Sequence, residues 1–230
     1  DDIFAASTAL FLLLIAVVTT NKAWPAFSEL GGSYFFGTEW VPSEGLYGIV
    51  PLVFGTILVS VLALVVAVPI SVGIALFVTE VVHRRARGAV TTTIDLLAAV
   101  PSVVFGLWGF YYLIPPFQTA FNAVSDAVSG IPVLSTIFGP STGSSYASAA
   151  LVLALMVTPI ITSVTREVFT TVPPNDKAGA LALGATRWEM IRGVVFPHST
   201  GGMTGAVMLG LGRAMGETVA VALLIGARPD

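Results

Sequence analysis

Five apolar stretches, each long enough to cross a lipid bilayer as a helix, constrain this chain more than any other feature. A bilayer core about 30 Å thick needs about 20 apolar residues in helical form. Only 10% of the residues are charged and 55% are hydrophobic, whereas soluble domains carry about 25% charged residues. The sequence therefore predicts an all-α membrane protein with five spans, at residues 3–20, 48–82, 88–113, 146–169 and 197–225.

Composition also narrows the classes of function. The net charge of −3 is small and spread out, which does not favour nucleic-acid binding. The chain has no cysteine, and its two histidines, His83 and His198, each lie at a predicted membrane edge. Wet interfacial histidines are a better interpretation than a metal site. A membrane-embedded enzyme would need a clustered acid, base and nucleophile, so we expect neither enzyme nor metal chemistry.

Three predicted spans contain a proline well inside the stretch. Proline removes one backbone N–H and frees the carbonyl four residues earlier, which bends a helix and exposes polar groups. Ser102 and Thr158 adjoin two of these positions and are candidates to line a polar path. Plain kinks, with the hydroxyls bonded to their own backbone, explain them equally well. The long stretch 48–82 implies tilt, a kink at its proline or an extension beyond the lipid. The prolines are Pro69, Pro101 and Pro159.

Basic residues predict the orientation in the membrane. If the spans alternate, seven lysines and arginines share one side, and the other side has only Lys22 and Arg228. The positive-inside rule makes the first side cytoplasmic and places the N-terminus there too. The outer loops are then 21–47 and 114–145, whose aromatic residues favour an interfacial belt over a docking surface. The cytoplasmic set is Arg84, Arg85, Arg87, Arg166, Lys177, Arg187 and Arg192.

The chain divides at the start of the second span. Residues 1–47 hold the first span and an outer loop, and residues 48–230 hold the transmembrane domain with a cytoplasmic segment, 172–196. The first residues lack the basic region of a signal peptide, so they predict a span. The chain starts without methionine and stops just after a span, so we expect one or both ends to be missing.

The segment 175–197 predicts a cytoplasmic helix. Two prolines precede it, Asn175 or Asp176 is a suitable N-cap, and the pattern continues until Gly193 and Pro197. Its first half consists mainly of Ala and Gly, which let another surface approach the backbone closely. A docking helix and an amphipathic connector on the membrane surface are equally compatible with this pattern.

Arg213 and Glu217 stand inside the last predicted span, in GLGRAMGETVAVALLIG. They are four residues apart, so a continuous helix would place them on one face. Arg213 lies about ten residues, or about 15 Å, into the span, close to the bilayer midplane. A charge there costs roughly 3 kcal/mol, so the pair should face protein or water. Mutual neutralisation that pins the bundle is one interpretation, and a transport role is the favoured one.

Several motifs carry a family resemblance. AVPSVVFGLWG at 99–109 and GLGRAMGETVAV at 210–221 closely resemble motifs of the permease subunits of phosphate ABC importers. Segment 175–197 resembles the cytoplasmic loop of ABC importer permeases, in which Ala180 and Gly184 match. Where that family usually has Glu, this chain has Ala178. The resemblance implies a type I ABC importer permease (MetI-like) helical bundle, with a sixth span expected beyond the five.

The resemblance further implies a coupling helix that docks on a separate ATPase. Asp176, Lys177 or Arg187 could supply the charge that alanine at position 178 does not carry. The residues expected to couple to the ATPase are Asp176, Lys177, Ala178, Gly179, Ala180, Gly184, Ala185, Arg187 and Trp188. ATP and Mg would belong to that ATPase, and this chain would hold no cofactor.

The implied function is import of inorganic phosphate across the bacterial plasma (inner) membrane. Partners would be a homologous permease subunit, an ATPase homodimer and an extracytoplasmic phosphate-binding protein. The guanidinium of Arg213 matches paired phosphate oxygens, and the carboxylate of Glu217 could accept from a phosphate P–OH, which sulfate lacks. A sulfate or molybdate importer is the nearest alternative, although such permeases usually have Phe where this chain has Thr218. A passive anion channel is a further alternative.

Overall fold

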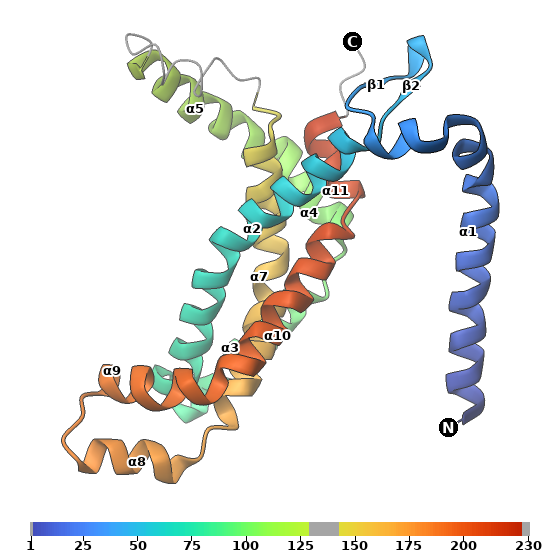
Figure 1. The fold of residues 1–230 in the computed structure, drawn as a ribbon. Coiled ribbons are helices and arrows are strands. Elements are labelled where there is room, and N and C mark those ends of the chain that lie inside the picture. The colour runs from blue at the N-terminus through green and yellow to red at the C-terminus, as the bar shows by residue number, and fades with distance from the viewer. Residues whose placement is uncertain (1, 129–142, 227–230) are drawn as a thin grey trace. The chain divides into compact units, whose positions relative to one another are not determined.

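The computed structural model describes residues 2–128 and 143–226, and nearly all of them are helical (Figure 1). The chain divides into two compact units, Asp1–Thr56 and Ile57–Asp230. Helix α2 (Val50–Leu76) begins in the first unit and continues into the second. The candidate functional residues all lie in the second unit.

The first unit consists of a long helix and a small hairpin. Helix α1 (Asp2–Phe36) is interrupted by a non-helical Gly31. Strands β1 (Trp40–Val41) and β2 (Leu46–Tyr47) pair antiparallel, with Trp40 opposite Tyr47. A 3-10 turn, η1 (Pro42–Glu44), joins them. The predicted loop 21–47 is therefore wrong in its first part, because the helix continues to residue 36.

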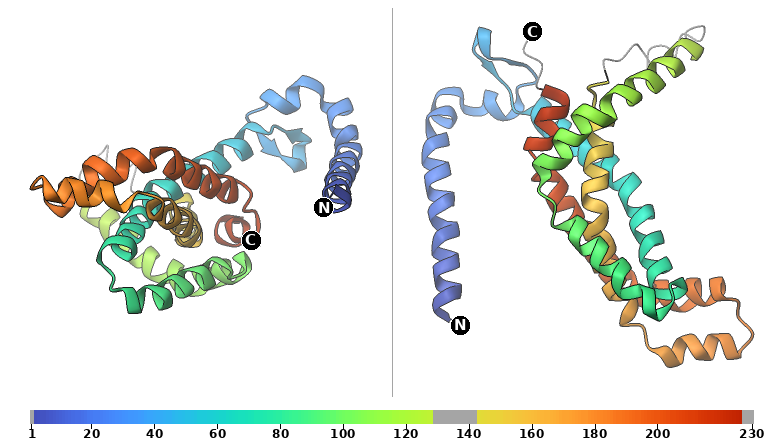
Figure 2. Two further views of the ribbon diagram at one scale, coloured as in Figure 1. Left: turned by 90° about the horizontal axis from the view of Figure 1, so that it is seen from below. Right: turned by 180° about the vertical axis from the view of Figure 1, so that it is seen from behind.

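The second unit is a bundle of long helices with short helices at both ends (Figure 2). The π-helical turn η2 (Phe77–Val81) extends α2. Then follow α3 (Arg84–Ala98), α4 (Ser102–Trp108), η3 (Gly109–Leu113), α5 (Ile114–Val128), α7 (Tyr146–Thr170), α8 (Pro174–Ala182), α9 (Arg187–Met190), η4 (Ile191–Val195), α10 (Phe196–Met215), α11 (Val219–Val221) and η5 (Ala222–Gly226).

Helix α7 forms the centre of this bundle. Its buried residues make most of the main core, together with residues of α2 and α10. Small residues permit the close approach of α10. A Cβ on Gly210 would lie 2.6 Å from side-chain atoms of Ile161. Across the α2 contact, Ser71 Oγ donates to the Thr158 carbonyl at 3.1 Å, so this buried hydroxyl is satisfied between the packed helices.

Three helices of the described residues are long and apolar enough to cross a membrane, and two bent pairs bring the number to at most five. The helices are Ala6–Pro25, Val50–Val81 and Tyr146–Thr170, and the pairs are Arg85–Ala98 with Ser102–Ala127 and Arg187–Met215 with Val219–Ile225. Five spans are compatible with this count. Pro69 lies within a helix that continues on both sides of it.

The third predicted span, 88–113, is not one continuous helix. Its two halves meet at an angle of 86°. Helix α3 ends at Ala98, and Pro101 precedes the first residue of α4. Proline disfavours helical backbone at the residue before it and has no N–H to donate, which explains the break. Helix α5 also occupies the start of the predicted outer loop 114–145, whose residues 129–142 lie outside the described part.

Most of the basic segments lie at one end of the second unit, as predicted from their charge. Figure 1 shows α8 and α9 at the same end as the start of α3. Helix α8 and the η2 turn are joined directly by an ion pair between Lys177 and Glu80, with Nζ 2.6 Å from Oε1. We call this end, defined by η2, the start of α3, α8 and α9, the basic end.

Candidate translocation path and coupling segment

The last predicted span breaks immediately after Arg213. Helix α10 ends at Met215, Gly216 is its C-cap, and the following helical segment is turned by 56°. A Cβ on Gly216 would approach only the backbone carbonyls of Gly212 and Arg213, the nearer at 3.4 Å. Glycine has weak helix propensity because it loses most backbone entropy, which makes this a favourable place to end a helix.

The break corrects the expected pairing of Arg213 with Glu217. Within the described residues, Glu80 with Lys177 is the only ion pair, and the two charges in the last span do not form one. Glu217 Oε1 instead accepts a hydrogen bond from the backbone N–H of Ala220, at 3.1 Å. That carboxylate therefore satisfies a free donor in the first turn of α11, where the helix dipole also favours a negative group. The side chain of Arg213 is exposed.

The two broken helices meet just beyond their breaks. A Cβ on Gly106 of α4 would lie 2.9 Å from the Cα of Ala220 in α11. Ser102, the first residue of α4, lies one turn before Gly106, and Glu217 lies three residues before Ala220. The fold thus brings α4 and α11 together at Gly106 and Ala220, which are more than 100 positions apart in the chain.

Thr158 occupies a different environment from Ser102. Its hydroxyl donates to the Ala154 carbonyl of its own helix, at 2.7 Å. This is the own-backbone bonding that the sequence left open. The nearby groove of about 390 Å³ lies between the α3–α4 break and α7 and includes Leu97, Trp108 and Pro159. Its lining is apolar, and the Trp108 indole is the one lining side chain with a hydrogen-bond donor.

The segment after α7 folds into two helices and not one. Helix α8 ends at Ala182, and Gly184 has a φ of +91°, a left-handed conformation that suits a helix end. Pro173 is the N-cap of α8, where the sequence favoured Asn175 or Asp176. Thr186 and Glu189 then form a capping box that starts α9.

The second helix of this segment continues directly into the last span. The N–H of Phe196 bonds to the Ile191 carbonyl across a π-helical turn, and Pro197 stands near the start of α10. The predicted end of the helix at Pro197 is therefore wrong. A proline is tolerated there because the wider turn already changes the hydrogen-bond register before it.

The predicted coupling residues remain largely exposed. Asp176, Ala178, Gly179, Gly184, Arg187 and Trp188 are exposed, and Lys177, Ala180 and Ala185 are half-buried. Leu183, at the α8–α9 turn, is 91% exposed. Leu181 and Trp188 of the same hairpin are also exposed, at 44% and 60%, and several exposed apolar side chains on one short segment indicate an interaction surface. Lys177, however, already forms an ion pair with Glu80 of the same chain.

Two acidic residues that connect helices in the structure were not predicted from the sequence. Glu80 pairs with Lys177, and Asp95 of α3 accepts a hydrogen bond from Ser163 of α7, with Oγ 2.9 Å from Oδ1. Both carboxylates lie within predicted spans, 48–82 and 88–113. Acidic residues in apolar stretches are unusual enough to have served as the signal.

Two broken spans, an arginine within the last of them and a helical hairpin at the basic end are the features expected of a membrane permease subunit. Residues 67–229 match the family described as "Binding-protein-dependent transport system inner membrane component". The chain belongs to this family, and it is thus a multi-pass inner membrane component of a transport system.

Curated relatives extend the match over nearly the whole chain. A "Phosphate transport system permease protein PstC" from Haemophilus influenzae is 40% identical over 98% of this chain and 75% of its own length. Proteins of the same name from Xylella fastidiosa and Pasteurella multocida are 42% and 43% identical, over 97% and 94% of this chain and 71% and 69% of theirs. The matches include both broken spans and the segment between them.

Proposed function

We propose that this chain is the permease subunit of an ATP-driven importer of inorganic phosphate. The similarity to phosphate permeases over 97–98% of the chain is the observation that carries this proposal. The chain forms the translocation path together with a homologous permease subunit. It supplies no catalytic chemistry, because ATP and Mg bind to the separate ATPase subunits.

Arg213 is the residue that eases the anion across the membrane. Its guanidinium offers a planar fork of donors that matches two phosphate oxygens. Because Glu217 accepts from the Ala220 N–H, and Arg213 forms no ion pair within the part of the chain that the structure describes, the guanidinium is available to an anion. A single cation lowers the barrier for transit without holding the substrate so tightly that release becomes slow.

Glu217 has two tasks in this proposal. One carboxylate oxygen fixes the start of α11 through the Ala220 N–H. A carboxylate has further lone pairs, and these can accept a hydrogen bond from a P–OH of phosphate. Sulfate is fully ionised at neutral pH and has no such proton, so Glu217 favours phosphate.

Ser102 and Thr158 are the other residues of the proposed path, and Ser102 contributes more to it than Thr158. Ser102 is the first residue of α4, one turn before Gly106, which contacts Ala220 of α11. In this proposal its hydroxyl and the free N–H groups of that first turn line the path. Thr158 contributes less, because its hydroxyl already donates to Ala154.

Helices α8 and α9 form the docking surface for the ATPase homodimer. The exposed small residues Ala178 and Gly179 permit close approach, and the exposed side chains of Leu183 and Trp188 supply apolar contact. Position 178 carries alanine where the family usually has Glu, and Lys177 is paired with Glu80. Of the three charged residues expected to compensate, Asp176 and Arg187 are therefore left to contact the ATPase. Nucleotide-driven motion of the ATPase reaches the spans through this segment.

The positive-inside rule completes the proposed arrangement in the bacterial plasma membrane. The basic end lies in the cytoplasm and the N-terminus lies on the same side. A phosphate-binding protein delivers its ligand at the opposite face, and lipid surrounds the bundle.

Uptake by the intact complex tests the proposal. The chain is reconstituted in vesicles with its partner permease, ATPase and binding protein, and radiolabelled phosphate uptake is measured with and without ATP. We expect ATP-dependent uptake that excess phosphate competes away and excess sulfate or molybdate does not. Uptake that sulfate or molybdate suppresses equally would favour the other oxyanions, and uptake without ATP would indicate a channel.

A further inference from the structure

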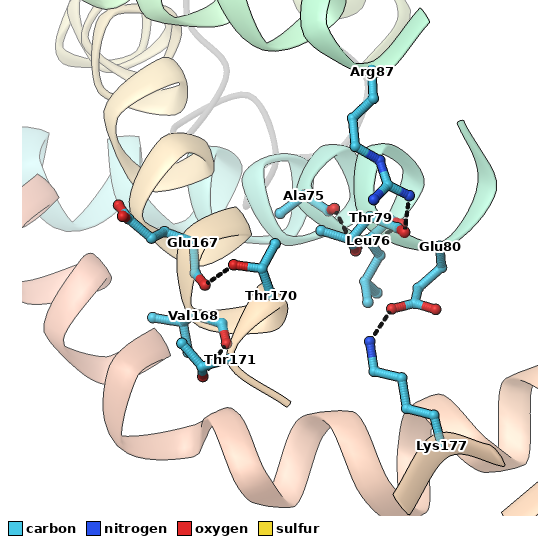
Figure 3. Close-up of polar contacts among 10 residues, drawn as sticks. All are labelled: Ala75, Leu76, Thr79, Glu80, Arg87, Glu167, Val168, Thr170, Thr171 and Lys177. Atoms are coloured by element: carbon cyan, nitrogen blue, oxygen red, sulfur yellow. Dashed lines mark hydrogen bonds and ion pairs between the residues drawn. The ribbon is translucent and has the colours of Figure 1, made fainter. Parts of the chain in front are cut away.

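An ion pair fastens the predicted coupling helix to the second span. Lys177 of α8 and Glu80 of η2 approach to 2.6 Å between Nζ and Oε1, as Figure 3 shows. Their side chains are only 20% and 15% exposed. A pair this well shielded from water is screened less than a surface pair, so its loss should have a measurable effect.

The η2 turn, which contains Glu80, is also hydrogen-bonded to helix α3. Residues Phe77–Val81 form a π-helical turn, and the guanidinium of Arg87 in α3 donates to the carbonyl of Thr79 within that turn (Figure 3). The neighbouring residues Thr79 and Glu80 therefore receive side chains from α3 and α8 respectively. Displacement of α8 would be passed to both the second and the third predicted span.

Apolar packing does not provide this connection for α8. A second core joins α2, α7 and the α9–α10 helix around Phe169, Met190 and Val195. Helix α8 has no buried residue and contributes only the partly buried Ala180 to that core. The ion pair is therefore the strongest attachment of α8 to the end of α2.

We infer that Glu80 is a positioning residue for energy coupling. By holding Lys177, it makes α8 move together with η2 when the ATPase moves. This inference rests on the proposed function, since it takes α8 as the ATPase contact. Lys177 is accordingly an internal link, and it does not replace the charge missing at Ala178.

Charge reversal in the intact complex tests the link. In reconstituted vesicles, phosphate imported per ATP hydrolysed is measured for Glu80→Lys, Lys177→Glu and the double variant. Each single reversal should lower this ratio at least about fivefold, the lower end of typical coupling between sites. The double variant should restore it to within about twofold, because the pair is re-formed in the opposite sense.

Two controls keep the result interpretable. Glu167→Lys makes the same charge change on the exposed, nearby end of α7, where the carboxylate forms no ion pair within the described residues, and the ratio should not change. If a reversed chain fails to assemble, Glu80→Gln breaks the pair without repulsion and should lower the ratio. Single variants that keep the wild-type ratio, or a double variant as defective as the singles, would overturn the inference. A wild-type complex that imports no phosphate would instead contradict the proposed function.

Discussion

Gly106 of α4 and Ala220 of α11 touch at the level of the backbone. A Cβ placed on Gly106 would lie 2.9 Å from the Cα of Ala220, closer than real Cβ atoms come. This contact holds together the two half-helices that follow the breaks. It depends on the absence of a side chain at Gly106, which belongs to the motif AVPSVVFGLWG at 99–109.

Substitution of Gly106 by alanine should therefore force α4 and α11 apart. We expect a decrease of about 1–3 kcal/mol in stability, as for other overpacked sites, together with reduced phosphate uptake. Thermal unfolding of the assembled complex measures the first effect. Gly205→Ala is the matched control, because a Cβ there meets nothing within 4 Å and alanine favours a helix. Equal stability of both variants would argue against the close approach of the two half-helices.

Two substitutions separate the tasks of Glu217. Glu217→Gln keeps an oxygen that can accept from the Ala220 N–H, so stability should be retained while phosphate uptake falls and sulfate exclusion weakens. Glu217→Ala removes the acceptor and should also cost about 1 kcal/mol in stability, like the loss of a helix cap. Uptake, sulfate competition and thermal unfolding are measured on both. Unchanged uptake and selectivity in the glutamine variant would remove the proposed contact with phosphate.

Arg213→Lys tests the guanidinium fork. Lysine keeps the positive charge but loses the planar pair of donors. A charge-assisted hydrogen bond contributes about 1.5–3 kcal/mol, so uptake should fall roughly tenfold to a hundredfold. Arg192→Lys, at an exposed arginine of η4, serves as the control and should transport normally. Wild-type uptake in the Arg213 variant would show that charge alone suffices.

Gly184→Ala tests the turn between α8 and α9. The glycine has a φ of +91°, and a Cβ there would meet no atom within 4 Å, so only backbone conformation is affected. An L-residue in left-handed conformation costs about 1–2 kcal/mol. We expect the hairpin to shift and less ATPase to co-purify with the permease. Gly201→Ala, in open space near the start of α10 and outside the docking surface, should leave the amount of ATPase unchanged. Equal co-purification in both variants would contradict a role for this turn in docking.

Much of the architecture could be predicted because lipid imposes simple requirements. A span must be about 20 apolar residues long, and its backbone must satisfy itself, so hydropathy alone located the helices around 6–25, 50–81 and 146–170. Motifs such as GLGRAMGETVAV similarly indicated the family, which the match over residues 67–229 confirmed. These signals are local in sequence and do not depend on how the helices pack.

Tertiary structure decided how the charged groups are used. A continuous helix would have paired Arg213 with Glu217, but the break at Gly216 gives that carboxylate to the Ala220 N–H instead. Lys177 pairs with Glu80, which is 97 residues away in the chain. The length of each apolar stretch fixes which segments become spanning helices. The partner of each charge is set by which helix ends the packed bundle brings together, and no local pattern records that.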